Sequence, residues 1–291
     1  MNNPLAQTNA DEQNKNWVKQ ALQGDREALN QLIQFHQPFI YQVAWKMVHD
    51  PDDALDLTQE VLIKVITKLS QFNFQSAFRT WLYRIVVNEF LLSKRRSKHL
   101  SYTSFEEYGE QLDAIPNPDL SREEELEIEE LSKEMQIRCM SGMLMCLNRE
   151  QRLIYILGDT FQVDHQTGAE IFDISPQNFR VKLHRARKDL YSYMQNKCGL
   201  INKENPCRCP KKAKALKDMG MLDPQKMQFN IQTKTRIMDY VEGAYQQART
   251  SIEDKYQALY QEHPARDDFD SETVVKELVN DQEIRRLFNL N

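Results

Sequence analysis

Apolar residues recur every three to four positions along much of the chain, which is the spacing of helices that bury one face. The first such stripe spans residues 28–48 and predicts a helix that Pro38 kinks or restarts. After Asp50 and Pro51, a second helix is expected to run to about Leu69. The buried side of this second helix is expected to carry Ala54, Thr58, Val61, Val65 and Leu69.

The window 166–190 has the pattern of two short helices joined by a tight turn. Asp173 and Ile174 mark the turn, Ser175 is placed as an N-cap, and Pro176 takes the first position of the second helix. Because successive helical residues are rotated by about 100°, one face of that helix collects the apolar side chains. The residues expected to face the core are Phe179, Leu183, Ala186 and Leu190.

The composition favours an all-α fold, because glycine is scarce and good helix formers are abundant. We expect one helical domain over residues 11–99 and a second, with the helix-turn-helix, over 134–195. An acidic linker, 100–133, joins them. A Cys-containing basic segment and a helical C-terminal extension occupy 196–291.

Two further local signals refine this division. Asn148 and Gln151 form a capping pair in front of an apolar run. A stripe of apolar residues from Ile237 to Leu259 predicts a long amphipathic helix in the extension.

The formal net charge of −5 hides a strong segregation of charge along the chain. Residues 101–135 hold twelve acidic and two basic residues, a local net charge of −10 that leaves +5 for the rest. With Pro116 and Pro118 and little apolar periodicity at its start, this acidic stretch is expected to act as a passive, self-repelling tether.

The outer face of the second helix in the helix-turn-helix is basic and rich in groups that can read bases. The segment from Ser175 to Lys188 has five Lys or Arg residues and no acid. Amide and guanidinium groups can contact base edges in a major groove, and flanking cations can reach phosphates. The face expected to contact DNA comprises Gln177, Asn178, Arg180, Val181, Lys182, His184, Arg185, Arg187 and Lys188. A solvated basic helix without a partner is the alternative.

The segment 72–99 combines aromatic and basic side chains, with a net charge of +5 from Ser76 to His99. Ser76 is placed to cap the helix that follows the aromatic loop. Stacking platforms beside phosphate-binding charges suit single-stranded DNA. Several of these aromatic side chains must nevertheless be core, and we expect Trp81 to be buried and Phe74 not.

The helix after Pro51 also has an unusual outer face. Asp56, Glu60, Ile63 and Thr67 lie opposite its buried stripe. An exposed isoleucine beside acidic residues suggests a protein-binding surface. A solvated face with one stray isoleucine is the alternative.

These segments together resemble a known family. The strings LNREQRLIYIL and GAEIFDISPQNFRVKLHRARKDL are similar to region 4 of the extracytoplasmic-function sigma factors. The strings DALDLTQEVLIKV and FRTWLYRIVVNEFLLSKRR are similar to region 2 of the same family, in the same order. The resemblance covers about half of the chain and implies a factor that directs RNA polymerase to promoters.

The resemblance also implies site residues. The second helix of region 4 would bind the upstream (−35) promoter element. The helix after Pro51 would dock on the coiled-coil clamp of core RNA polymerase through Asp53, Asp56, Gln59, Glu60 and Ile63. The downstream (−10) element, with its flipped base, would be bound by Phe72, Phe74, Arg79, Tyr83, Arg84, Asn88, Lys94, Arg95 and Arg96. In the family the acidic linker threads through the polymerase, where its charge could mimic RNA.

Three of the five cysteines lie close together in the basic segment, at Cys198, Cys207 and Cys209. They could bind zinc with a fourth ligand such as His184 or His165, but the paired C-x-x-C spacing of zinc knuckles is missing. Free thiols and a redox-sensitive cluster are the competing interpretations. No other cofactor is expected.

Other functions receive less support from the sequence. No phosphate-binding loop or nucleophile arrangement indicates an enzyme. The start of the chain has no signal-peptide pattern, and no window approaches the roughly 18 apolar residues of a spanning helix. We therefore expect a cytoplasmic protein without membrane insertion.

The expected partners are core RNA polymerase, promoter DNA and an anti-sigma factor. Two alternative functions remain open: a helix-turn-helix regulator that binds operators unaided and senses a ligand with its C-terminal region, and a decoy that occupies polymerase without reading DNA. The C-terminal extension itself could be an inhibitor of the DNA-binding domains, a partner site or a third structural domain.

Overall fold

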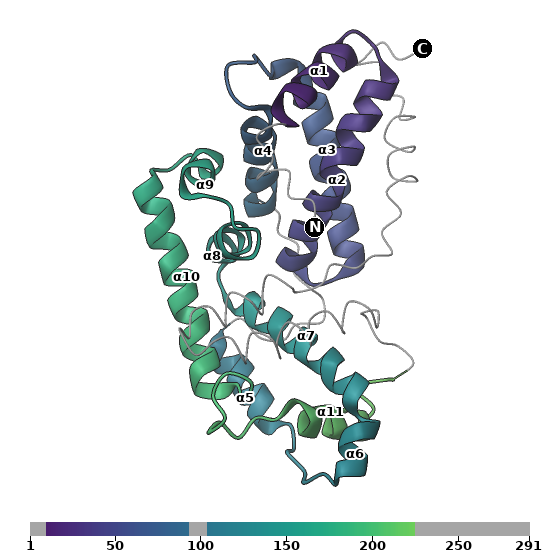
Figure 1. Cartoon of the computed structure of the whole chain (residues 1–291), viewed down its shortest axis with the longest axis vertical. Helices are drawn as coiled ribbons and strands as arrows, with labels where there is room; N and C mark the ends of the chain where they lie inside the picture. Colours follow the sequence, from purple (N-terminus) through teal and green to yellow (C-terminus); the bar gives the residue numbers. More distant parts are fainter. Residues whose placement is uncertain (1–9, 93–103, 225–291) are drawn as a thin grey trace. The chain divides into compact units, whose positions relative to one another are not determined.

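The computed structural model describes residues 10–92 and 104–224 (Figure 1). Regular structure in these residues is entirely helical, and no strand occurs among them, so the all-α expectation is confirmed. The described residues divide into two compact units, one made of 10–92 with 156–182 and the other of 104–155 with 183–224. No helix within 10–92 or 104–224 is long and apolar enough to cross a membrane.

Four helices and a 3-10 turn build the first part of the first unit (Figure 1). They are α1 (Ala10–Leu22), α2 (Arg26–Val48), α3 (Pro51–Lys68), η1 (Leu69–Gln71) and α4 (Phe78–Leu92). The carboxylate of Asp25 caps α2 and that of Asp50 caps α3, each by accepting two backbone N–H groups. Helix α2 is continuous through Pro38, so of the two predicted alternatives, a kink or a restart, the restart does not occur.

Helix α3 follows its sequence prediction closely. It begins at Pro51 and passes into the 3-10 turn at Leu69. Its predicted stripe is buried throughout, at Ala54, Thr58, Val61, Val65 and Leu69. The unit's core also encloses the large side chains of Phe39, Trp45, Phe78, Tyr83 and Phe90.

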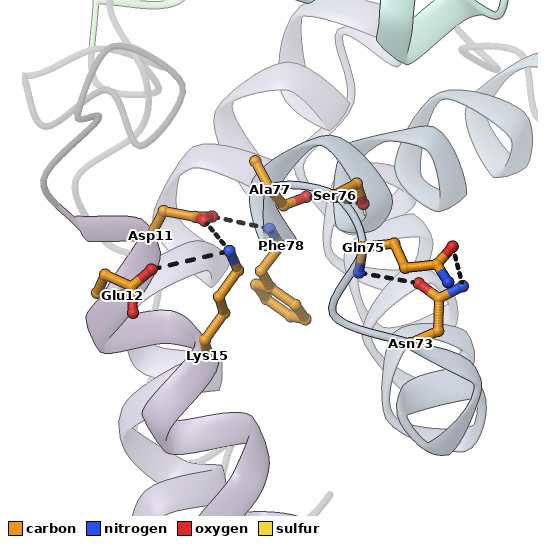
Figure 2. Close-up of polar contacts among 8 residues, drawn as sticks. All are labelled: Asp11, Glu12, Lys15, Asn73, Gln75, Ser76, Ala77 and Phe78. Atoms are coloured by element: carbon orange, nitrogen blue, oxygen red, sulfur yellow. Dashed lines mark hydrogen bonds and ion pairs between the residues drawn. The ribbon is translucent and has the colours of Figure 1, made fainter.

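The start of α4 is fixed from a distant part of the chain (Figure 2). The carboxylate of Asp11 on α1 accepts the backbone N–H of Phe78 at 2.7 Å. The hydroxyl of Ser76 instead contacts the carbonyl of Ala77, so the prediction that Ser76 caps this helix is wrong. Lys15 holds the Asp11 carboxylate by an ion pair of 3.0 Å.

The remaining helices carry the second half of the chain. A π-helical turn, η2 (Ile156–Thr160), and α9 (His165–Phe172) belong to the first unit, and α10 (Pro176–Lys197) begins there and continues into the second. The second unit also contains α5 (Phe105–Ala114), α6 (Arg122–Glu127), α7 (Glu129–Cys146), α8 (Arg149–Tyr155) and α11 (Cys209–Asp218).

The acidic stretch is folded rather than extended, which corrects the tether interpretation. Ser104 caps α5, and Ser121 with Glu124 forms a full capping box on α6. Helix α11 packs against α7 (Figure 1). Apolar side chains shared by these helices form a small core of Leu112, Ile128, Leu131, Met135, Ala213 and Leu222. The high acid content therefore coexists with a buried apolar face.

Some predictions lie outside the described residues. They are the basic cluster Lys94, Arg95 and Arg96, and the amphipathic stripe from Ile237 to Leu259.

Candidate nucleic-acid interface

The turn between α9 and α10 has the predicted helix-turn-helix construction. Asp173 adopts the left-handed conformation at the end of α9, with φ of 56°. The hydroxyl of Ser175 accepts the N–H of Asn178 at 3.1 Å, which confirms the predicted N-cap, and α10 begins at Pro176. The two helices lie so close that a Cβ added at Gly168 would meet the Phe179 ring at 2.5 Å. This contact fixes how α10 is presented.

Helix α10 has one buried face and one exposed face, as predicted. Its core residues are each at most 1% exposed: Phe179, Leu183, Ala186 and Leu190. On the other side, the exposed side chains are Gln177, Asn178, Arg180, His184, Arg185 and Lys188, whereas Val181, Lys182 and Arg187 are half-buried. Base-reading amides and guanidinium groups thus share an accessible surface with cations that can bind phosphate.

Contacts that sequence reasoning did not predict, made by Gln151 and Arg152, support this helix within the second unit. Asn148 and Gln151 form the predicted capping pair, with the N–H of Gln151 donating to the Asn148 side chain at 2.9 Å. Gln151 also donates to the carboxylate of Asp189 on α10 at 3.0 Å. Arg152 donates to the carbonyls of Leu144, Met145 and Leu147 at 2.8 to 2.9 Å, which closes the end of α7.

The predicted polymerase-binding face of α3 is only partly accessible. Asp56, Glu60 and Ile63 are exposed, with 41% of Ile63 accessible, and Gln59 is half-buried. Asp53 is only 8% exposed, so the prediction that it lies on the accessible, polymerase-binding face is wrong. It lies in the first turn of α3, where its backbone N–H donates to the capping carboxylate of Asp50 at 2.9 Å.

Two of the aromatic residues predicted to bind DNA belong to the core. Phe72 is 3% exposed and Tyr83 is 1% exposed, so neither presents a ring to a base in this conformation. The Tyr83 hydroxyl lies 3.3 Å from Nδ1 of His36 in the same interior. The sequence did not predict the burial of Phe72 and Tyr83, because aromatic and basic residues alternate in this segment and the pattern does not show which side chains other helices cover.

The rings of the aromatic loop and of the start of α4 pack together in tilted and edge-to-face contacts. Phe74 is half-buried against Phe72, with ring centroids 4.7 Å apart, and the ammonium group of Lys19 lies over the Phe74 ring, 5.6 Å from its centroid. The expectation that Phe74 is not buried is confirmed. Trp81 was expected to be buried but is half-buried, with its centroid 5.5 Å from those of Phe72 and Phe78. Phe74 in the loop and Trp81 in the first turn of α4 are thus the partly accessible rings of this region.

The described basic residues of α4 differ in accessibility. Arg84 and Asn88 are exposed and Arg79 is half-buried. Arg84 is already engaged, because its Nε donates to the carbonyl of Glu170 at 2.5 Å and its guanidinium lies 3.7 Å from Asp173. These contacts hold Arg84 in place while part of its guanidinium group stays exposed.

The cysteines are all free thiols. His184 is exposed on α10, and His165 packs its ring beside Phe179 at 6.1 Å. Within residues 10–92 and 104–224, no three His, Cys, Asp or Glu side chains already stand in a metal-binding arrangement.

Comparison with known proteins matches both segments. Residues 32–99 match the family model of Sigma-70 region 2, and residues 137–190 match that of Sigma-70 region 4. The chain is 24% identical over 186 residues to the ECF RNA polymerase sigma factor SigW of Bacillus subtilis, covering 62% of this chain and 97% of SigW. It is 28% identical over 186 residues to the ECF RNA polymerase sigma-E factor of Escherichia coli, covering 61% and 92% respectively. A shorter match, 39% over 77 residues, links it to the RNA polymerase sigma-H factor of Pseudomonas aeruginosa, covering 26% and 40%.

Proposed function

We propose that separate surfaces of this chain bind the two promoter elements and core RNA polymerase. The chain belongs to the extracytoplasmic-function sigma factors of the sigma-70 family. As a sigma factor it works with core RNA polymerase and promoter DNA in transcription initiation.

The exposed face of α10 reads the upstream element in the major groove. Arg185, Gln177 and Asn178 offer hydrogen bonds to base edges, and Arg180 and Lys188 lie beside them for phosphates. The single observation that supports this assignment most strongly is the separation of faces on α10: every predicted core residue is buried, and the base-reading side chains are accessible.

Helix α4 and the preceding loop bind the downstream element. Because Phe72 and Tyr83 are core residues, base stacking is assigned to Phe74 and Trp81, which are partly accessible. Asn88 and Arg79 lie on the helix that follows, and the basic cluster 94–96 continues it in sequence. Capture of unstacked bases then favours strand opening without a chemical energy source.

The exposed side of α3 contacts polymerase through Asp56, Glu60 and Ile63. An accessible apolar side chain flanked by carboxylates fits a protein partner with a basic and apolar surface. We propose further that the chain contributes no catalytic step, acts in the cytoplasm where polymerase works, and is held inactive by an anti-sigma factor. A regulator that binds operators unaided has no need of the segment that matches region 2.

Transcription in vitro tests this proposal. Purified full-length chain is added to core polymerase on a fragmented genomic library, and initiation sites are mapped. We expect initiation at a limited set of promoters that share paired upstream and downstream elements. Failure of the chain to associate with core polymerase at low salt contradicts the proposal, and so does initiation that is unchanged by its addition.

A further inference from the structure

Helix α1 contacts the aromatic loop (residues 72–77) near its start and the first residue after it. The ammonium group of Lys19 lies over the ring of Phe74, 5.6 Å from its centroid. The carboxylate of Asp11 accepts the backbone N–H of Phe78, the first residue of α4, at 2.7 Å (Figure 2). Helix α1 also packs against the η1 turn before the loop and against α4 after it. One helix therefore supports the chain on both sides of the loop.

The residues of α1 that make these contacts lie on one face. Asp11, Lys15 and Lys19 are spaced by four residues, which places them in a stripe along the helix. At a rise of about 1.5 Å per residue, the stripe extends over about 12 Å, enough to follow the loop from Phe74 to Phe78. Lys15 pairs with the Asp11 carboxylate at 3.0 Å and keeps it in place as the acceptor for α4.

The backbone of the loop is strained at Phe74. This residue has φ of 63°, in the left-handed region that a bulky side chain rarely adopts. Such a conformation persists only where the surrounding structure holds it. Within the loop, the Asn73 side chain accepts the N–H of Gln75 at 3.1 Å and donates to the Gln75 side-chain oxygen at 3.2 Å (Figure 2). Both bonds are exposed to solvent, so the loop gains from support by another element.

The Phe74 ring receives that support from two directions in sequence. Its contact with Phe72, at 4.7 Å between centroids, joins it to a ring that is itself in the core. The contact with Lys19 comes from α1, and a cation over an aromatic ring is attracted to it. The ring is only half-buried, so part of its surface remains accessible to a base.

We propose that α1 positions the base-binding loop, with Lys19 holding the ring of Phe74 and Asp11 holding the start of α4. The loop is then already formed when an unpaired base arrives, so less conformational freedom is lost on binding. This inference rests on the proposed role of Phe74 in base stacking. Helix α1 lies before residue 32, where the match to Sigma-70 region 2 begins, so the family match does not assign this role.

Hydrogen exchange of the free full-length chain tests whether α1 supports the loop. Lys19 is exposed, so Lys19→Met removes the cation without opening the core. An exposed cation over a ring corresponds to a factor of about two to five in an equilibrium. The amides of residues 73–77 should therefore exchange about two- to fivefold faster in Lys19→Met. Lys19→Arg keeps a cation for the ring and should restore slow exchange, and Gln20→Met at the next exposed position is the matched control.

Strand opening by the holoenzyme tests the consequence for DNA. The probe is a promoter recovered by the transcription mapping, with 2-aminopurine in the non-template strand of the downstream element, where its fluorescence rises as the duplex opens. Opening should be about two- to fivefold less favourable with Lys19→Met than with wild type or Gln20→Met. The effect should vanish in a chain that also carries Phe74→Leu, because Lys19 then has no aromatic ring to hold.

The outcomes separate this inference from the proposed function. Loop exchange in Lys19→Met at the wild-type rate overturns the role of α1, even where promoters open normally. An effect of Lys19→Met that persists beside Phe74→Leu also overturns it, because Lys19 then acts on DNA directly, as a phosphate contact does. A wild-type holoenzyme that opens no promoter contradicts the proposed function instead, and the exchange measurement still decides whether α1 holds the loop.

Discussion

The buried ammonium group of Lys212 donates a hydrogen bond to the main-chain carbonyl of Leu112 at 2.9 Å, across 100 residues of sequence. It also donates to the carbonyl of Ile115, and the neighbouring Lys211 pairs with Asp119 at 2.6 Å. The Asn117 side chain donates to the carbonyl of Pro206 at 2.9 Å. A segment beyond the helix-turn-helix thus fastens the acidic stretch in place.

Replacement of Lys212 by methionine should open this attachment. The change keeps the length of the side chain and leaves the two carbonyls without their donor, at a cost of about 1 to 3 kcal/mol. Local opening should therefore become roughly 5- to 150-fold more frequent, and trypsin should cleave faster after the exposed Arg122 of α6. Lys217→Met, an exposed site on the same helix, is the matched control and should leave the cleavage rate unchanged. Equal rates for Lys212→Met and the control would refute the role of Lys212.

Asp11 should matter more for the stability of the first unit than Ser76 does. Asp11→Ala removes the cap on the N–H of Phe78, and loss of a cap costs about 1 kcal/mol. The three tryptophans all lie in residues 10–92, so fluorescence during urea unfolding reports on this unit. Ser76→Ala and Glu12→Ala should have effects within about 0.5 kcal/mol. If Ser76→Ala lowers the stability more than Asp11→Ala does, Ser76 caps this helix after all, as the sequence predicted.

Arg185→Ala should weaken selection of the upstream promoter element. If the guanidinium makes a bidentate contact to a guanine, its loss costs about 1 to 3 kcal/mol and relaxes the preference at that position. The measurement is binding or transcription on promoters that vary in the upstream element. Arg122→Ala removes the same charge from an exposed site on α6 and should change no preference. An Arg185 variant with the wild-type pattern of promoter preference would show that another residue reads the element.

Asp56→Arg should impair assembly with core polymerase and leave the fold intact. The side chain is exposed on α3, so reversal of its charge changes the binding surface more than the core. Native gels or light scattering with core polymerase measure assembly, and circular dichroism checks helicity. Glu110→Arg makes the same charge reversal on the exposed side of α5 and should assemble normally. If the Asp56→Arg variant assembles with core polymerase as well as the wild type does, this face of α3 does not bind polymerase.

The first unit should lose stability in mild acid because of His36. Burial lowers the pKa of His36 from 6.5 to about 3, so the folded chain keeps this ring neutral where the unfolded chain protonates it. Stability falls as the pH drops below 6.5, by up to about 1.4 kcal/mol per pH unit, until about pH 3. The difference in unfolding free energy between wild type and His36→Phe, measured by tryptophan fluorescence, should change by this amount between pH 6 and 5. A constant difference over that range would contradict the lowered pKa.

Local periodicity was enough to locate the helices that carry the proposed binding surfaces. The buried stripe of α3, the faces of α10, and the caps at Ser175 and Asn148 all depend on residues within a few positions of one another. Such features are set by helix geometry and by nearby hydrogen-bond donors and acceptors, which the sequence displays directly. The order of the two family segments is likewise a property of the sequence alone.

Only the tertiary structure decided which side chains the rest of the chain covers. Asp11 caps a helix 67 residues away, Phe72 and Tyr83 are buried by neighbouring helices, and Lys212 holds a stretch that charge alone marks as a tether. Cys139 packs against the same apolar clusters as Cys198 and Cys207, from which it is distant in sequence. A hydrophobic or charged pattern shows that a helix face must pack against another segment. Which segment covers it depends on packing between parts of the chain that are distant in sequence, and nothing in the local sequence identifies them.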